Sequence, residues 1–212
     1  MFHEIKNPLT LINSSLQLIE EEHPEVQDFR FWNQTMKDVQ NLCLLINELS
    51  SFQKSSLLNI HRINLFDFTE DLLESMESYL LENNISLTFN CPDPDLDFDA
   101  DSLKLRQAVV NLLKNAAESS PSGTSIELQI FSDNTLLHIF VKDQGCGMSE
   151  QQMLHIFEPF HTTKSYGTGL GLPIVKNIME AHNGTISVNS TPTAGTVVHL
   201  TLPLIQQSVS YS

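Results

Sequence analysis

The spacing of the apolar residues changes near position 57, and this change limits the possible folds more than any other feature of the chain. Before it, apolar residues recur at steps of three and four, namely Phe2, Ile5, Leu9, Ile12, Leu16 and Ile19. Such a stripe is typical of a helix that packs against other helices. After it, short segments of period two, such as "SIELQIFS", alternate with helical ones. The sequence therefore predicts two regions, residues 1–56 and 57–212, with different architectures.

The first region is predicted to be an all-α helical hairpin. After a break at "EEEHPEVQD", Val39, Leu42, Ile46 and Leu49 continue the same rhythm and predict a helix over residues 30–54. Two helices of this length bury too little apolar surface to be stable alone. We therefore expect the hairpin to join a second copy in a four-helix bundle, which makes the chain a homodimer. The alternative is that the hairpin packs on the chain's own second region.

The second region alternates predicted strands and helices. Strands are expected at residues 62–65, 85–90, 96–100, 125–132, 136–143, 184–190 and 195–203, and helices at 66–81, 102–119 and 170–182. Asp101 is expected to cap the helix that follows it, because a carboxylate can accept the free N–H groups of a first turn. The two strands around the turn "DNT" should form an antiparallel hairpin. Helices beside a mixed sheet make an α+β two-layer domain.

Charge and cysteine content exclude several classes of protein. The 212 residues include 26 acidic and 11 basic side chains, a formal net charge of −15. This balance argues against nucleic acid as a partner, because phosphate contacts need an excess of Lys and Arg. No apolar stretch reaches the length of about 18 residues that a membrane span needs, and no signal-peptide pattern is present. The three cysteines are far apart and suit reduced thiols. We therefore expect a cytoplasmic segment without membrane contact.

One helix of the second region carries candidate ligands. The motif "NLLKNAAES" places Asn111, Lys114 and Asn115 on one helix face, because residues three and four apart are neighbours. Amide oxygens can ligate Mg²⁺, and a lysine can contact phosphate oxygens. Taken alone, such residues more often form a solvated helix face.

A glycine-rich turn follows a predicted strand in "DQGCGMS". Asp143 stands at the strand end, where its carboxylate could accept a hydrogen bond from an exocyclic amine such as that of adenine. Gly145 and Gly147 let the backbone turn closely around a flat group. The alternative is a simple tight turn.

The most specific stretch is "FEPFHTTKSYGTGLGL". Gly167, Gly169 and Gly171 open the helix expected at 170–182, and the N–H groups of a helix start favour phosphate. Further hydrogen-bond donors just upstream are Thr162, Thr163 and Lys164. The spacing GxGxG differs from the dinucleotide-binding fingerprint.

The motifs "NLLKNA", "DQGCG", "FEPF" and "GTGLGL", in this order, resemble the N, G1, F and G2 boxes of the histidine-kinase catalytic domain in the GHKL ATPase superfamily. At the start of the chain, "HEIKNPLT" resembles the H box of the dimerisation and phosphotransfer domain of these kinases. The resemblance to a two-component sensor histidine kinase core covers nearly the whole chain. It implies an autokinase that uses ATP and Mg²⁺ and passes the phosphoryl group to an aspartate of a response-regulator receiver domain.

The resemblance also implies a role for each motif residue. His3 is the expected phosphoacceptor, Glu4 a general base that makes its ring nitrogen more nucleophilic, and Asn7 a residue that positions water to dephosphorylate the regulator. Asn115 is the expected Mg²⁺ ligand. The implied ATP-binding residues are Asn111, Lys114, Asn115, Asp143, Gly145, Gly147, Phe160, Thr162, Thr163, Lys164, Gly167, Thr168, Gly169, Leu170, Gly171 and Thr196.

A lid over ATP is implied for residues 149–168. Phe157 and Phe160 are its expected apolar hinge, and Lys164 is expected to reach the terminal phosphate. Together with Mg²⁺ and the helix start, this lysine would give an acidic protein a local positive potential.

Two other functions fit parts of the sequence. Another GHKL enzyme, such as a gyrase-like or chaperone ATPase or an anti-sigma serine kinase, would lack a hairpin bearing "HEIKNP". A phosphatase-dominant or non-catalytic adaptor for a receiver domain would keep the same surface. Because only Met1 and Phe2 precede His3, we expect an N-terminally truncated form of a parent that could be membrane-anchored. An alternative helix start has Asn7 as N-cap and Pro8 at the first helical position.

Overall fold

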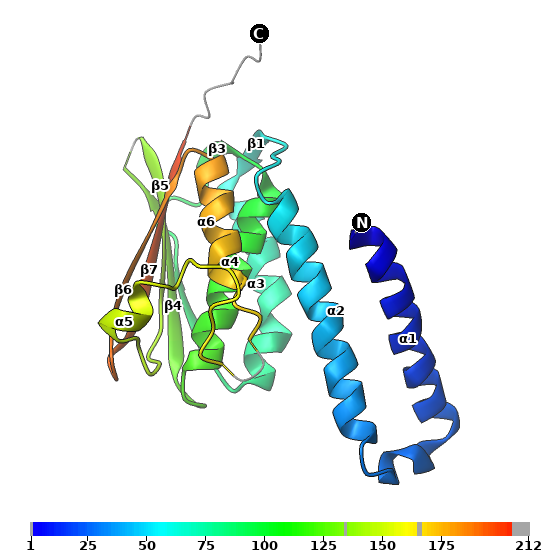
Figure 1. Cartoon of the computed structure of the whole chain (residues 1–212). Helices are drawn as coiled ribbons and strands as arrows, with labels where there is room; N and C mark the ends of the chain where they lie inside the picture. Colours follow the sequence, from blue (N-terminus) through cyan, green and yellow to red (C-terminus); the bar gives the residue numbers. More distant parts are fainter. Residues whose placement is uncertain (1, 134, 165–166, 205–212) are drawn as a thin grey trace.

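The computed structural model describes residues 2–133, 135–164 and 167–204, which form a helical hairpin followed by an α+β domain (Figure 1). The hairpin consists of α1 (Phe2–Glu22), a short 3-10 helix η1 (Pro24–Asp28) and α2 (Trp32–Lys54). The sequence pattern did not predict η1. Of the helices within these ranges, none combines the length and the apolar character needed to cross a lipid bilayer.

Helix α1 begins at Phe2 and contains Pro8 in its interior. The alternative start with Asn7 as the N-cap is therefore wrong. A proline inside a helix removes an N–H donor and crowds the carbonyl four residues earlier, yet the turns on both sides of Pro8 remain helical. The hydroxyl of Thr10 donates to the carbonyl oxygen of Lys6 at 2.9 Å, which adds a local bond in this turn.

The apolar stripe of α1 is only partly covered by the rest of the chain. Leu9 is buried and Leu16 is half-buried. Ile5, Ile12 and Ile19, which recur every seven residues, keep 46%, 50% and 41% of their surface exposed. The hairpin therefore uses one part of the stripe for its own packing and leaves the other part open.

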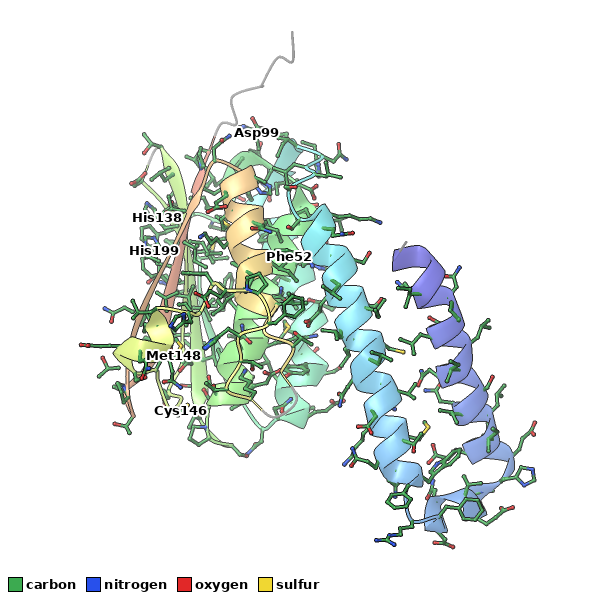
Figure 2. All side chains as sticks on the ribbon, viewed as in Figure 1. Phe52, Asp99, His138, Cys146, Met148 and His199 are labelled. Atoms are coloured by element: carbon green, nitrogen blue, oxygen red, sulfur yellow. The ribbon has the colours of Figure 1, made fainter. Side chains whose placement is uncertain are left out.

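Helix α2 contacts the α+β domain through its C-terminal half. Leu45, Leu49 and Phe52 pack against the core of that domain, and α2 lies beside α6 (Gly171–Ala181). Figure 2 shows Phe52 where the two regions meet. Part of the hairpin's apolar surface thus packs on the chain's own second region. This packing is the alternative that the sequence left open beside packing on a second copy.

The α+β domain is built on a five-stranded mixed sheet. Its order is β2 (Ser86–Asn90), β4 (Ser125–Ser132), β5 (Leu136–Lys142), β7 (Gly195–Pro203) and β6 (Thr185–Thr191). Strand β2 runs parallel to β4, and the other neighbours are antiparallel. The predicted mixed sheet and the antiparallel hairpin around "DNT" are confirmed. A separate two-stranded sheet pairs β1 (His61–Asn64) with β3 (Asp97–Ala100).

Three helices cover one face of the large sheet, namely α3 (Leu65–Glu82), α4 (Ser102–Ser119) and α6 (Figure 1). Alternate residues of the central strands point toward these helices, so Leu128, Ile139 and Leu200 have no exposed surface. The predicted α+β two-layer architecture is confirmed.

The predicted cap of α4 is also confirmed. Asp101 accepts a hydrogen bond from the backbone N–H of Lys104 at 3.0 Å. Its second carboxylate oxygen accepts from the N–H of Asn59, in the segment that follows α2. Its own N–H donates to Nε2 of the buried His182 at 3.0 Å. The start of α4, the end of α6 and the inter-region segment therefore meet at one residue, Asp101.

Candidate functional site

Asp143 follows β5 directly and lies buried at its end, 8% exposed. Its Oδ1 accepts the N–H of Gly145 at 2.8 Å and the N–H of Thr196 at 3.0 Å. Burial raises the pKa of Asp143, whereas these two hydrogen bonds and the charge of Lys164 act in the opposite direction. Because both bonds go to Oδ1, the described contacts leave Oδ2 available as an acceptor.

Three glycines allow the backbone to pack closely around Asp143. A Cβ on Gly145 would lie 2.7 Å from the carbonyl oxygen of Ser119, at the end of α4. Gly147 has φ +65°, and a Cβ there would meet the carbonyl oxygen of Thr191 at 1.9 Å. Gly195, with φ +84°, packs against the carbonyl of Asp143 itself. A larger residue at Gly145 or Gly195 would crowd Oδ1 of Asp143, whereas one at Gly147 would crowd the backbone at Thr191.

Thr196 of β7 forms two hydrogen bonds with Asp143. The backbone N–H of Asp143 donates to the carbonyl oxygen of Thr196 at 2.9 Å, and the N–H of Thr196 donates to the side-chain Oδ1 of Asp143. The hydroxyl of Thr196 lies 2.9 Å from that of Ser190. The structure therefore brings together two predicted site residues that are 53 positions apart.

The predicted ligand face of α4 is split in the structure. Asn111 and Asn115 are half-buried, and Oδ1 of Asn115 accepts a hydrogen bond from Nζ of Lys164 at 3.5 Å. Lys114 is exposed, and its Nζ lies 5.3 Å from the ring centre of Tyr79 on α3. Asn115 thus meets the predicted lid residue, whereas Lys114 turns toward α3.

The lid carries a short helix, α5 (Glu150–Met153), which the sequence pattern did not predict. Ser149 and Gln152 form its capping box. Cys146 and Met148 lie beside α5 at one end of the sheet (Figure 2). Phe157 is half-buried below Nζ of Lys176 at 5.5 Å, whereas Phe160 is 58% exposed.

Phe160 marks the return of the lid toward α6. It has φ +68°, and its N–H donates to the carbonyl oxygen of Gly169 at 3.1 Å. Thr162 and Thr163 are exposed, and the hydroxyl of Thr162 accepts the N–H of Lys164 at 3.1 Å. Both threonines are thus accessible from the solvent side.

The glycine-rich loop ends at the start of α6. Leu170 is fully buried and forms the N-cap, and its N–H donates to the hydroxyl of Thr168 at 3.3 Å. A Cβ on Gly171 would lie 3.4 Å from Nδ2 of Asn115, so the first turn of α6 faces the amide of α4. A Cβ on Gly167 would meet the hydroxyl of Thr162 at 2.5 Å.

Thr168 also contacts the hairpin. Its hydroxyl donates to a carboxylate oxygen of Glu48 on α2. This contact connects two residues that are 120 positions apart, and the apolar packing of Phe52 on the same domain accompanies it. The hairpin therefore carries a carboxylate to the loop that was predicted to bind phosphate.

The three catalytic residues predicted from the H box belong to α1. The side chains of His3 and Glu4 lie outside the described residues. Asn7 is exposed on the helix. The structure thus places the backbone of the H-box segment on a helix.

Sequence reasoning missed three residues of this region, namely Glu118, Tyr79 and Glu48. Glu118 forms an ion pair with Lys164, with 2.5 Å between Oε2 and Nζ. It lies three positions after Asn115, and helix periodicity alone places both on one face. The partners of Tyr79 and Glu48 are distant in sequence, so no local signal could have identified them.

A cavity of about 390 Å³ lies beside this site, between the lid and the edge strand. Its lining residues are Met148, Glu150, Met153, Val188, Asn189, Ser190, Thr191 and Pro192. None of the predicted site residues is among them. The cavity therefore neighbours the turn at Gly147 but is separate from the contacts of Asp143 and Asn115.

Comparisons with known proteins agree with this arrangement. The family model "Histidine kinase-, DNA gyrase B-, and HSP90-like ATPase" matches residues 100–206. Sporulation kinase A of Bacillus subtilis (strain 168) is 33% identical over 203 residues, which are 95% of this chain and 33% of that protein. The chain spans between 28% and 48% of the length of the four sporulation kinases it matches.

Two solved structures share most of the fold. The histidine kinase ThkA in complex with the response regulator protein TrrA is 25% identical with a TM-score of 0.71, covering 95% of this chain and 59% of that chain. Full-length ShkA in complex with AMPPNP is 22% identical with a TM-score of 0.79, covering 97% of this chain and 45% of that chain. The family model covers half of the chain, including the segments that hold Asn115, Asp143 and the glycine-rich loop. The chain belongs to the family of histidine kinase-, DNA gyrase B- and HSP90-like ATPases.

Proposed function

We propose that the chain is the core of a sensor histidine kinase, which binds Mg-ATP in its α+β domain and transfers the γ-phosphoryl group to His3. The phosphoryl group then passes to an aspartate of a response-regulator receiver domain. The observation that carries this proposal is the meeting of Asp143, Asn115, Lys164 and the start of α6 around one end of the sheet. These groups match the three parts of a nucleotide, which are base, metal-bound phosphates and terminal phosphate.

Asp143 is the proposed adenine partner. Its Oδ1 is held by two backbone N–H groups, so the carboxylate has a fixed orientation with Oδ2 available. An ionised carboxylate only accepts hydrogen bonds and therefore selects an exocyclic amine. The close contacts of Gly145 with Ser119 and of Gly195 with Asp143 hold the backbone around this carboxylate in place.

The residues of the phosphate side fit a bound cation. Oδ1 of Asn115 accepts a hydrogen bond from the ammonium group of Lys164 at 3.5 Å, which supports a cation at this position. Mg²⁺ commonly takes one or two protein oxygens and fills its remaining positions with phosphate oxygens and water. Asn115 would hold the metal, which supplies charge neutralisation of the phosphates. The first N–H groups of α6 and Lys164 would contact the phosphate oxygens.

The proposed transfer moves one phosphoryl group twice. A neutral ring nitrogen of His3 attacks the γ-phosphorus, the bond from this phosphorus to the bridging oxygen breaks, and its electron pair leaves with ADP. Glu4 accepts the proton that the imidazole gives up. The carboxylate of the receiver aspartate then attacks the phosphorus, the N–P bond breaks with its electron pair going to the ring nitrogen, and Glu4 returns the proton, which restores the neutral imidazole. Asn7, on the same helix, is proposed to position water for hydrolysis of the phosphorylated regulator.

The open seam of α1 supports a dimer. Ile5, Ile12 and Ile19 are exposed at heptad spacing, and Leu42 on α2 is 46% exposed. Apolar residues in this pattern form the seam of helical bundles. We propose that two hairpins join in a four-helix bundle, while the contact of Phe52 with the α+β domain stays within one chain.

Relatives support the partner and the nucleotide. ThkA was solved in complex with the response regulator protein TrrA, and ShkA in complex with AMPPNP. By analogy, the proposed partner of this chain is a receiver domain, and the proposed substrate is ATP with Mg²⁺.

Incubation with γ-labelled ATP and Mg²⁺ tests the proposal. The wild type should acquire acid-labile, base-stable label. His3→Gln should abolish the label while nucleotide binding persists, and His23→Gln, which changes an exposed histidine of the same hairpin, should keep it. Label that persists in His3→Gln would refute the assignment of the acceptor.

A further inference from the structure

An ion pair in this structure occupies the proposed cation position. Nζ of Lys164 lies 2.5 Å from Oε2 of Glu118 and 3.5 Å from Oδ1 of Asn115. Asn115 and Glu118 are three positions apart on α4 and therefore present their oxygens on one face. The lid lysine thus takes the place between two oxygen ligands that a metal ion would take.

We propose that Glu118 is a positioning residue that exchanges one cation for another. Without nucleotide it holds Lys164 beside Asn115. With Mg-nucleotide, Lys164 turns to the terminal phosphate and Glu118 holds the hydrated metal ion next to Asn115. This inference rests on the proposed function, and it adds a role for a residue that the motif comparison does not assign.

Charge balance requires the exchange. Glu118 is an anion beside the proposed phosphate site, and the phosphates add further negative charge. If Lys164 left without a replacement, like charges would face each other across a few ångströms and oppose nucleotide binding. A divalent cation at Asn115 removes this repulsion. Lys164 and the metal therefore compete for the same oxygens until the phosphates provide a second place for the lysine.

Tyr79 holds the carboxylate in the required orientation. Its hydroxyl donates to Oε1 of Glu118 at 3.3 Å, so Oε2 remains directed to the lid. Burial, followed by the charge of Glu118, raises the pKa of Tyr79 to about 12, which keeps the hydroxyl a donor. Lys114 is closer to Glu118 in sequence than Lys164 is, but its ammonium group lies over the ring of Tyr79. Among the described contacts, the ion pair of Glu118 is with Lys164.

The pair is suited to exchange because it is accessible to solvent. The side chains of Lys164 and Glu118 are 37% and 44% exposed. Ion pairs with this exposure contribute little to folding stability. Removal of the Glu118 charge should therefore alter ligand binding and lid position while the fold remains intact.

Binding of a fluorescent ATP analogue across a Mg²⁺ titration tests the inference. We expect Glu118→Gln to need roughly tenfold more Mg²⁺ for half-maximal binding, as observed when an outer-shell metal partner is removed. Binding in EDTA should be as tight as in the wild type or tighter, because Lys164 is released to the phosphates. The matched control is Glu127→Gln, which removes an exposed glutamate paired with Lys142 on the sheet, and it should behave as the wild type.

Limited trypsin digestion gives a readout without nucleotide. Cleavage after Lys164 should be several-fold faster in Glu118→Gln than in the wild type and in Glu127→Gln, because the lysine loses its partner.

An unchanged Mg²⁺ midpoint in Glu118→Gln, or equal weakening with and without Mg²⁺, would overturn the inference. If Asn115→Ala abolishes the Mg²⁺ requirement but Glu118→Gln does not shift it, only this inference fails. If the wild type binds no nucleotide, the proposed function fails with it.

Discussion

The two regions of the molecule bury their apolar residues to very different degrees. In the α+β domain, the strands and three helices enclose a core with residues such as Leu128 and Ile139 fully buried. In the hairpin, large apolar side chains remain open along both helices and their connection. They are Ile5, Leu11, Ile12, Leu18, Ile19, Phe29, Phe31, Leu42 and Leu44.

Polar groups follow the same division. Among the residues the structure describes, the buried side-chain atoms without a hydrogen-bond partner are Oδ1 of Asn13 and Nε1 of Trp32, both in the hairpin. A complete core pairs nearly all of its buried polar groups. The α+β domain therefore closes its own core, whereas the hairpin leaves apolar surface uncovered, which is consistent with the proposed packing on a second copy.

The largest expected effect is a difference in the free energy of unfolding between a substitution in the α+β domain and one in the hairpin. Leu128→Ala removes a fully buried side chain of β4 and should lower the free energy of unfolding by about 2–5 kcal/mol. Leu11→Ala, at a position of α1 that is 68% exposed, should change it by less than about 0.5 kcal/mol. Chemical denaturation of both variants measures this contrast. Similar losses would contradict the division into a closed and an open region.

The next prediction concerns association. Ile12→Lys puts a charge into the proposed seam of the bundle and should raise the dimer dissociation constant at least about 100-fold, or ~2.7 kcal/mol. The control is Leu103→Lys on α4, where the leucine is 75% exposed outside the hairpin, and it should leave the dimer intact. Mass in solution as a function of concentration distinguishes them. A dimer of unchanged strength in Ile12→Lys would show that this seam is not the interface.

The junction between the regions should respond to pH. His182 is fully buried, accepts the N–H of Asp101 through Nε2, and donates from Nδ1 to the carbonyl oxygen of Ile178. Burial lowers the pKa of His182, although the Ile178 bond and the charge of Asp101 oppose the shift. Below the unfolded pKa of about 6.5, the unfolded chain takes up the proton first, so stability falls as pH decreases.

This group can reduce the free energy of unfolding by at most about 1.4 kcal/mol per pH unit below that point. Above it, the neutral ring keeps its full contribution. Urea denaturation at several pH values between 7 and 5 measures how the free energy of unfolding changes with pH. This change should be smaller for His182→Gln than for the wild type. If the free energy of unfolding changes equally with pH in both proteins, groups other than His182 cause the pH dependence.

The smallest expected effect tests the contact between the two regions. Glu48 accepts a hydrogen bond from Thr168, so the hairpin holds a negative charge at the proposed phosphate loop. Glu48→Gln should tighten nucleotide binding by roughly two- to fivefold, because this repulsion is partly screened at the surface. Glu22→Gln, which removes an exposed charge of α1, should have no effect. Weaker binding in Glu48→Gln would mean that the carboxylate supports the loop.

Much of the fold could be predicted because its signals are local. The alternation over residues 125–132 and the capping aspartate before Ser102 gave the bounds of β4 and α4. The short helix α5 was missed because four residues cannot show a helical period, although Ser149 and Gln152 carry a capping-box pattern. Pairing of β1 with β3 depends on tertiary contact and left no local trace.

The candidate site also has parts that local sequence signals predict and parts that they do not. The turn at Asp143 and the ligand face at Asn115 follow from strand ends and helix periodicity. The contacts of Lys164 with Glu118 and of Thr168 with Glu48 connect residues 46 and 120 positions apart, so they require the folded structure. Lys114 was expected near the phosphates, but its long side chain reaches the ring of Tyr79 on the neighbouring helix.

The most direct test of the central claim is a calorimetric titration of ATP with Mg²⁺ into the wild type and Asp143→Asn. The substitution keeps the shape of the side chain and an oxygen for the two backbone N–H groups, but it replaces Oδ2, the proposed acceptor for adenine, with an NH₂ donor. The wild type should bind one nucleotide per chain, and Asp143→Asn should bind at least about tenfold more weakly. Equal affinity of the two proteins, with both folded, would contradict the assignment of the nucleotide site to this end of the sheet.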